Sequence, residues 1–391
     1  MVAARLDFDR PESKIVVDGI VDMAPSDPLT HYAAAAILEK TFDANDLKRS
    51  LAEYQTAAQL APYNYLNWLN LGRARDLTGD TDGASAAYSR AMELAPNYSY
   101  VQWLCGNFAL RQGKTAEGFA LIAKAAASNP DYAQPAVLTA LQIFDADVNA
   151  VRRSLGDNAV TNGALTTNLA GQKHFDEAVD AWSHLKADDT SINYKKLGEA
   201  LVSQLVVAKK FELASRVTSD MLPADAEKLI TGKVANGGFE NGVKLRNAGT
   251  FEWQIADGGE PQVGMSDTTK KNGKFALSLA FNSFDTSAFR TIAQTVAVVP
   301  GAEYELEVFY RSDVKTNSRI KWEVADASTT AAITSTPPIA PAADWTSLKV
   351  VFKVPAGVDG IILRLTRDGC GGPTCPTNGK LLFDDISLRR L

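Results

Sequence analysis

A period of 34 residues between Tyr65 and Pro130 constrains the fold of this chain more than any other feature of its sequence. When the sequence is shifted onto itself by that spacing, small residues and prolines coincide: Gly72 with Gly106, Ala91 with Ala125, and Pro62 with Pro96 and Pro130. A fixed period of this length, with two helices in each unit, is typical of a helical solenoid. Solenoids work by presenting an extended surface to a partner. The sequence therefore predicts an α-α solenoid that binds another molecule.

The composition is that of a globular chain with room for more than one domain. Its 391 residues suffice for about two or three domains. The formal net charge of −6 argues against nucleic acid as the main partner, because neutralising phosphates requires a basic face. No run of about 18 or more apolar residues occurs, so we expect no membrane-spanning helix. The first residues, MVAARLDFDRPESK, lack the apolar core of a signal peptide, and the sequence leaves open whether a leader was removed before them.

The apolar pattern changes its period once along the chain. From about Ser26 to Asp225 apolar residues recur every three or four positions, as in amphipathic helices. From Val234 onward, short runs alternate apolar and polar residues between clusters of turn-forming residues, as in antiparallel strands. The region between them has no long Gly/Ser or Pro tract, so we expect a short, fixed linker. The predicted domains are an N-terminal extension (1–25), a helical repeat domain (26–230) and an antiparallel β-sandwich (234–391).

The alternation also predicts which side chains of the sandwich point inward. In FALSLAF, YELEVFY and LKVVFKVP every second residue is large and apolar. The last of these segments places Leu348, Val350 and Phe352 toward the core, whereas Phe309 and Arg311 fall on the outward side of YELEVFYR. GIILRLTR and KLLFDDISL complete a series that is typical of a two-sheet sandwich.

The helical units resemble the tetratricopeptide repeat family. The matching positions in one unit are Trp68, Leu71, Gly72, Ala84, Tyr88, Ala91 and Pro96. The resemblance is strong over residues 50–130 and weaker over 160–222. It implies that the aromatic residues Trp68, Tyr88 and Trp182 fill the space between helices and belong to the core.

The same resemblance implies that the first helix of each unit lines a concave, partner-binding face. The polar residues expected on that face are Asn70, Arg73, Asn107 and Arg111. An asparagine and a cation on adjacent turns can grip a peptide carboxylate, as clamps in some family members do. The alternative is an ordinary solvated helix face.

The β half resembles the jelly-roll carbohydrate-binding modules, which have a galactose-binding-like fold. The segment NGGFE (236–240) opens it, GKFALS (273–278) lies within it, and FDDISL (383–388) closes it. The resemblance implies a structural calcium shared by Glu240 and Asp385, because hard oxygen ligands would hold the two ends of the sandwich together. The alternative is a pair of strand-edge carboxylates neutralised by lysine or arginine.

A glycan ligand is the second implication of this resemblance. Sugar recognition requires an aromatic plane and a few polar groups that bind hydroxyls. The outward candidates are Phe309, Arg311, Trp322 and Arg364. Trp253 and Trp345 match positions that lie in the core of family members, and we assign them to the core. The alternative is that this sheet face is only solvated.

Cys370 and Cys375 lie together in the loop RDGCGGPTCPTNG. No second Cys/His pair lies near them, which argues against zinc. The glycines of the loop allow a disulfide ring to close, and a disulfide would favour an oxidising compartment. The alternative is two reduced thiols in a surface loop.

The sequence contains no recognisable catalytic signature. Its three histidines, His31, His174 and His184, form no metal-binding spacing, and no nucleophile elbow, P-loop or dinucleotide fingerprint occurs. We therefore expect a non-catalytic adaptor that binds a protein or peptide through the solenoid and a glycan through the jelly roll. The domain combination resembles extracytoplasmic proteins of the bacterial cell envelope, including factors in exopolysaccharide assembly or export. The alternatives are a protein-interaction scaffold whose sandwich caps the solenoid, and a polysaccharide-modifying enzyme.

Overall fold

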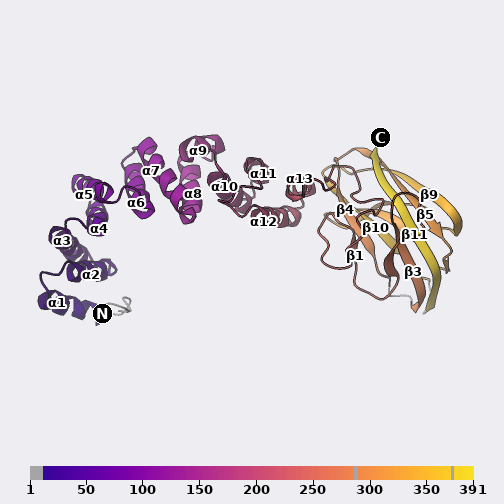
Figure 1. Ribbon diagram of the computed structural model, residues 1–391, viewed down its shortest axis with the longest axis horizontal. Helices are drawn as coiled ribbons and strands as arrows, with labels where there is room; N and C mark the ends of the chain where they lie inside the picture. The colour runs from indigo at the N-terminus through magenta and orange to yellow at the C-terminus, as the bar shows by residue number, and fades with distance from the viewer. Residues whose placement is uncertain (1–11, 286–288, 371–373) are drawn as a thin grey trace. The chain divides into compact units, whose positions relative to one another are not determined.

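The computed structural model of the chain describes residues 12–285, 289–370 and 374–391. The chain divides into two compact units, Met1–Asn168 and Leu169–Leu391. The helical elements, labelled in Figure 1, are α1 (Glu12–Met23), α2 (Pro28–Glu39), α3 (Ala44–Leu60), α4 (Tyr65–Leu77), α5 (Thr81–Leu94), α6 (Ser99–Arg111), α7 (Thr115–Ser128), η1 (Pro130–Tyr132), α8 (Ala133–Ile143), α9 (Val148–Leu155), α10 (Ala159–Gly171), α11 (Phe175–Ser183), α12 (Tyr194–Val207) and α13 (Phe211–Met221). Strands follow from residue 254 onward, so the predicted order of helices and then strands is confirmed.

The helix boundaries reproduce the 34-residue period of the sequence. Helices α4 and α6 begin and end 34 residues apart, and so do α5 and α7. One hydrogen bond repeats as well: the indole of Trp68 donates to the carbonyl of Pro62 at 2.9 Å, and the amide of Gln102 donates to that of Pro96 at 2.8 Å. Gln102 therefore keeps the polar contact of the aromatic residue that it replaces in the repeat.

Side-chain caps fix where several of these helices start. Asp27, Asp43, Asn64 and Asp80 each accept a hydrogen bond from a backbone N–H of the following first turn. Such caps satisfy N–H groups that have no partner inside the helix. The repeated prolines come two residues after the helix ends, as predicted.

Glycine allows α6 and α7 to touch through their backbones. A Cβ atom added to Gly106 would lie 2.9 Å from the carbonyl oxygen of Gly118, and one added to Gly118 would lie 2.9 Å from that of Gly106. In the preceding unit, a Cβ on Gly72 would lie 3.0 Å from the ring of Tyr88. The Gly positions of the repeat are therefore places of closest helix approach, as the resemblance implied.

The aromatic residues expected in the helical core do not all reach the same depth. Tyr88 and Trp182 are buried, whereas Trp68 is half-buried beside the clusters on either side of α4. The segment expected as an N-terminal extension contains α1, and Val17 of this helix packs against Ala34 and Leu38 of α2. Among the described helices, none combines the length and the apolar character needed to cross a membrane.

The strands form two antiparallel sheets that face each other (Figure 1). Their bounds are β1 (Gln254–Ile255), β2 (Gln262–Ser266), β3 (Ala276–Asp285), β4 (Ile292–Ala297), β5 (Glu303–Ser312), β6 (Lys315–Thr316), β7 (Ile320–Asp326), β8 (Ala332–Ser335), β9 (Ala342–Lys353), β10 (Gly360–Arg367) and β11 (Thr374–Arg390). Sheet A has the strand order β1-β4-β10-β7-β8. Sheet B has the order β2-β3-β11-β5-β9, and β6 also pairs with β11.

The core of the sandwich lies between these two sheets. Alternate residues of each strand are buried, such as Tyr304, Leu306 and Val308 on β5 and Ile361 and Leu363 on β10. The predicted antiparallel sandwich is therefore confirmed. Because successive residues face opposite ways, the remaining side chains of β5 and β10 lie on the two outer faces of the sandwich.

Helix α13 packs directly against the sandwich within the second unit. Phe211, the first residue of α13, is buried, and a Cβ added to Gly360 of β10 would lie 2.5 Å from its ring. The backbone N–H of Glu212 donates to the carboxylate of Asp359 at 3.3 Å, and that of Gly232 donates to the carbonyl of Ala297 at 2.7 Å. The linker is thus short and tied to the sheet, as the sequence indicated.

Candidate binding surfaces

The predicted carboxylate clamp of Asn70 and Arg73 exists, but the carboxylate that it holds belongs to the same chain. Both terminal nitrogens of Arg73 on α4 donate to Glu39 at the end of α2, one of them at 2.6 Å. Arg73 also donates to the amide oxygen of Asn70 at 3.1 Å, and Tyr54 donates to Glu39 at 3.1 Å. Asn70 is buried and Arg73 half-buried. These residues therefore join neighbouring repeats, and a peptide carboxylate would have to displace Glu39.

Similar polar pairs join other first helices in the first unit. The guanidinium of Arg111 on α6 donates to Asp76 on α4, with Nε at 3.1 Å, and the amide of Asn168 on α10 donates to Gln134 on α8 at 2.6 Å. The partners lie 35 and 34 residues apart, as Arg73 and Glu39 lie 34 apart. Asn107 donates to a carbonyl of its own helix. The polar residues of this face thus work mainly between helices.

The structure separates the four predicted ligand residues of the sandwich. Phe309 and Arg311 lie on the outer face of sheet B, where they alternate with the buried residues of β5. Arg364 lies on β10, on the outer face of sheet A. The two arginines are therefore on opposite faces, and they cannot belong to one binding site.

Trp322 does not lie on an outer face of the sandwich, contrary to the prediction. It is fully buried in β7, where its ring lies 5.8 Å from that of Trp253 and 5.2 Å from that of Phe383. Its indole N–H has no hydrogen-bond partner within the described residues. The large apolar contact area of this ring explains why the core retains it despite the unpaired donor.

Arg364 and Phe309 both have partners within the chain on the outer faces of the sandwich. The guanidinium of Arg364 pairs with Glu323, with Nε 2.6 Å from the carboxylate, and reaches the carbonyl of Thr330 at 3.2 Å. The ammonium of Lys271 lies over the ring of Phe309, 3.9 Å from its centroid. Neither residue presents a free binding group, although both were predicted to do so.

Arg311 differs from these residues because its guanidinium is unpaired. It is exposed, and its guanidinium has no hydrogen bond or ion pair in the described part of the chain. On β5 it lies between Tyr310, which pairs with Thr346 of β9, and Ser312, which pairs with Ala342 of β9. The register shifts between these two pairs, and Trp345 belongs to the irregular stretch of β9 opposite Arg311. Trp345 is half-buried and does not pack against the core cluster. An unpaired cation and a half-buried aromatic ring therefore occur at the same end of the β5–β9 pair.

Trp345 was assigned to the core, but it lies outside the core cluster. Leu348 and Val350 pack against the core, as predicted, and Phe352 is buried there. The alternation extends from Leu348 to Phe352, whereas Trp345 lies where the register of β9 against β5 shifts, and alternation does not fix its direction there. The core position that the resemblance to carbohydrate-binding modules implied for Trp345 is therefore wrong, since this residue is half-buried and lies outside the core cluster.

The predicted calcium residues already have partners in the segment that follows β2. Glu240 accepts hydrogen bonds from the backbone N–H groups of Lys274 at 2.7 Å and Phe275 at 3.5 Å. Asp385 accepts from the ammonium of Lys271 at 2.7 Å and from the amide of Asn272 at 2.5 Å. Within the described ranges, no group of three or more His, Cys, Asp or Glu side chains is arranged to hold a metal ion. This donor set, as arranged, does not fit calcium.

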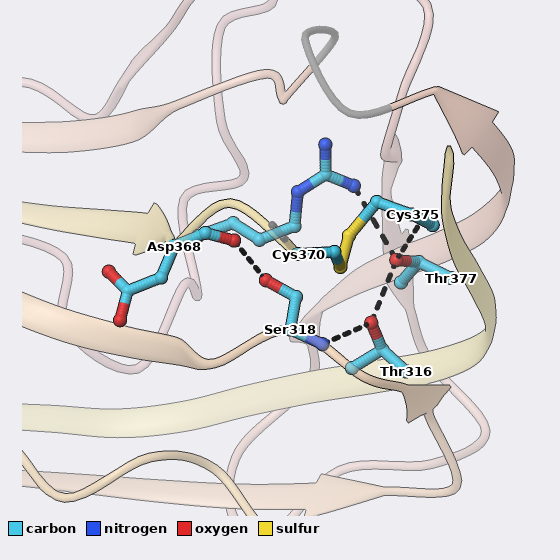
Figure 2. Close-up of a disulfide and its surroundings, with 7 residues drawn as sticks. Thr316, Ser318, Asp368, Cys370, Cys375 and Thr377 are labelled. Atoms are coloured by element: carbon cyan, nitrogen blue, oxygen red, sulfur yellow. Dashed lines mark hydrogen bonds between the residues drawn. A yellow bond between two sulfur atoms is a disulfide. The ribbon is translucent and has the colours of Figure 1, made fainter. Parts of the chain in front are cut away.

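The predicted disulfide between Cys370 and Cys375 is confirmed, with the two Cα atoms 5.5 Å apart. Figure 2 shows it beside a group of hydroxyl side chains, in which Thr377 and Thr316 lie 3.0 Å apart and the N–H of Ser318 donates to Thr316 at 3.1 Å. The bond ties the end of β10 in sheet A to the start of β11 in sheet B. It therefore closes the connection through which the chain crosses from one sheet to the other.

Removing this disulfide should destabilise the sandwich by about 2 kcal/mol. The two cysteines are separated by 5 residues, and closing so small a loop restricts the unfolded chain only modestly. Chemical denaturation should give a lower midpoint for the Cys370→Ser/Cys375→Ser variant than for the oxidised parent. A reducing agent should lower the midpoint of the parent to the same value and leave the variant unchanged. A parent that does not respond to the reducing agent would contradict a stabilising bond.

A cavity of about 440 Å³ lies between the end of α13 and the residues before β1. Its rim includes Glu252, whose pKa burial tends to raise, but hydrogen bonds from Lys244 and from the N–H of Gly249 lower it overall. The ammonium of Lys244 lies 2.7 Å from this carboxylate. A carboxylate that is kept ionised is not prepared to donate a proton, as a general acid must.

No protein-family model matches the chain. A stretch of 144 residues is 32% identical to BBSome complex member bbs-4 of Caenorhabditis elegans, and it covers 36% of this chain and 30% of that protein. The chain thus spans less than a third of the length of this relative.

Solved structures similar to the chain fall into two groups. The first group contains carbohydrate-binding modules. One of them is a CBM4 structure, with a TM-score of 0.30 and 17% identity, covering 40% of this chain and 99% of that one. Another is TmCBM61 in complex with beta-1,4-galactotriose, with a TM-score of 0.30 and 15% identity, covering 40% of this chain and 96% of that one. The APC/C hetero-tetramer Cut9-Hcn1 is similar at a TM-score of 0.33 and 16% identity, covering 54% of this chain and 42% of that one.

Proposed function

We propose that this chain is a non-catalytic adaptor whose sandwich binds a glycan on the outer face of sheet B. The observation that carries the proposal is that the unpaired guanidinium of Arg311 and the half-buried ring of Trp345 occur at the same end of the β5–β9 pair. The ring offers a plane for the C–H face of a sugar, and the guanidinium offers several donors for hydroxyl or carboxylate oxygens. The two groups that sugar recognition needs thus occur in one region of the sandwich.

The strands next to Arg311 leave space for a ligand. Arg311 pairs in register with Leu382 of β11, which pairs with Ser278 of β3, which pairs with Gly264 of β2. The last two of these residues have small side chains, and a Cβ added to Gly264 would meet no atom within 4 Å. The side chains of β3 and β2 at this position therefore project little from the sheet. A sugar chain could lie across them.

A glycan array with the full-length chain tests this proposal. Trp345→Ala and Arg311→Ala should each weaken binding about tenfold or more, as truncations of central aromatic and arginine contacts commonly do. Arg364→Ala is the matched control, because it removes the same charge from the opposite face of the sandwich. The proposal fails if no glycan binds, or if Arg364→Ala weakens binding as much as Arg311→Ala.

We propose that the helical repeats hold a protein partner. Exposed aromatic side chains support this, since Tyr63 is 82% and Tyr98 56% exposed where the chain enters α4 and α6. Tyrosine combines a large contact area with a hydroxyl group, which suits a surface that is solvated until a partner arrives. The bbs-4 relative is, by its name, a member of a complex.

A second candidate function is a scaffold in which the sandwich serves as a structural cap. The insertion of Phe211 against Gly360 favours it, because an exposed terminal helix of a solenoid needs to be covered. This role does not require a ligand on sheet B. The glycan array therefore separates the two candidates.

An extracytoplasmic location is part of the proposal, and the disulfide supports it, since such bonds persist in oxidising compartments. A role in the assembly or export of a bacterial exopolysaccharide is the finer form of the proposal. It rests on the domain combination and would be tested by the glycan that the array selects. That the chain is non-catalytic is also part of the proposal, and the absence of a catalytic motif from its sequence supports it.

A further inference from the structure

Three carboxylates of the sandwich converge on one short segment, Lys271–Phe275. They are Glu240 from the opening motif and Asp384 and Asp385 from β11. A Cβ added to Gly238 would lie 3.7 Å from an oxygen of Asp385 and 3.9 Å from an oxygen of Asp384. The negative charges therefore share a small space where the first and last parts of the domain meet.

A bulge in β11 brings the two aspartates to the same place. The register of β11 against β5 shifts between Asp384 and Ser387, and Asp385 has a positive φ of 45°. Consecutive residues of a regular strand point to opposite faces, but at a bulge they can point the same way. A non-glycine residue in this conformation is strained and persists only when its surroundings hold it.

Asp384 is fully buried and is satisfied by backbone groups. Its carboxylate accepts hydrogen bonds from the N–H groups of Lys271 at 2.8 Å, Asn272 at 3.2 Å and Asp385 at 2.8 Å. Burial raises the pKa of this carboxyl, while these hydrogen bonds act in the opposite direction. Its oxygens thus face N–H donors of the segment.

Lys271 is the cationic side chain that reaches this cluster. Its ammonium lies 2.7 Å from Asp385, and its own backbone N–H binds Asp384. The ammonium of the neighbouring Lys270 instead donates to the carbonyl of Lys274 at 3.2 Å. Lys271 is also about three-quarters buried, with 26% of its side chain exposed, and it lies over the ring of Phe309.

This arrangement differs from what calcium requires. Calcium takes about six to eight oxygen ligands that converge on one point. Here the oxygens of Glu240, Asp384 and Asp385 diverge toward separate N–H groups, and the remaining positive charge comes from the lysine. We propose that the segment Lys271–Phe275, with the Lys271 ammonium in place of a calcium ion on Asp385, joins the opening and closing segments of the sandwich, so that the domain folds without metal.

Thermal unfolding of the full-length chain tests the absence of a calcium requirement. The melting temperature of the sandwich should be the same in millimolar calcium chloride as in EDTA. A calcium ion bound only to the folded state, at a concentration about 100 times its Kd, would raise the melting temperature by roughly 5 °C or more. A rise of that size, reversed by EDTA, would overturn the proposal.

A substitution at Lys271 tests the positive part of the proposal. Lys271→Met keeps the aliphatic stem and the backbone N–H but removes the charge, and it should lower the melting temperature by roughly 3–6 °C. Lys270→Met is the matched control and should shift it by about 1 °C or less, since its ammonium is exposed. Equal shifts for the two variants would overturn the proposal, even with no response to calcium.

Discussion

Replacing Trp322 with alanine should destabilise the sandwich by about 3–5 kcal/mol in the free energy of unfolding. The ring is fully buried between Trp253 and Phe383, so its removal leaves a cavity that the two sheets can fill only in part. Urea unfolding followed by circular dichroism would measure this loss. Trp345→Ala is the matched control, because it removes the same side chain from a half-buried position outside the core cluster and should cost about 1 kcal/mol or less.

Trp322→Phe sharpens this prediction. The smaller ring still fills most of the space, and it removes an indole N–H that has no partner within the described residues. An unpaired buried donor is unfavourable, so the gain from deleting it partly offsets the lost contact area. Trp322→Phe should therefore cost clearly less than Trp322→Ala. If Trp322→Ala keeps the parent stability and loses glycan binding instead, the core assignment is wrong and Trp322 is a ligand residue.

The local periods of the sequence were sufficient to predict the elements. The 34-residue repeat predicted helices that recur at that spacing, and the alternation in β5 and β9 predicted their inward residues. The same alternation assigns Trp322 to the core, because Ile320 and Val324 of β7 are buried on the same side. The prediction for Trp322 was thus wrong against information that two-residue periodicity already contained.

The arrangement of the sheets could not be predicted in the same way. Arg311 and Arg364 both occupy outward positions of their strands, but β5 belongs to sheet B and β10 to sheet A. Which strands pair is decided by contacts between residues far apart in sequence, and no local pattern records it. The partners of Arg73 and Lys271 are non-local for the same reason. Glu39 lies 34 residues from Arg73, and Asp385 lies 114 residues from Lys271.

The contact between α13 and the sandwich leads to the second large expected effect. Gly360→Val should separate α13 from β10, because its side chain would occupy the space of the Phe211 ring. The atoms in the way are Cβ, Cγ and Cδ2, which lie near the backbone of Phe211 and cannot move aside cheaply. A cost of about 2–3 kcal/mol would raise the population of the opened contact on the order of 30–150-fold.

Limited proteolysis at Lys228 and Lys233 would measure this opening, since both residues are exposed in the linker. Gly264→Val is the control, because a side chain there meets no atom within 4 Å, and it should not change the cleavage rate. Phe211→Ala should also accelerate cleavage. In the Phe211→Ala background, Gly360→Val should accelerate cleavage less than it does in the parent, because the ring that the valine side chain would clash with is absent. Equal cleavage of the parent and Gly360→Val would contradict a packed contact.

The result also bears on which function the sandwich serves. If it is mainly a cap, opening the contact should destabilise α12 and α13, whose apolar residues would then be exposed at the end of the helical repeats. If it is mainly a glycan-binding module, the opened variant should keep its helices and bind sugar as the parent does. The proposed glycan-binding face on sheet B and the Phe211 contact at Gly360 belong to different sheets, so the two candidate functions can be separated by mutation.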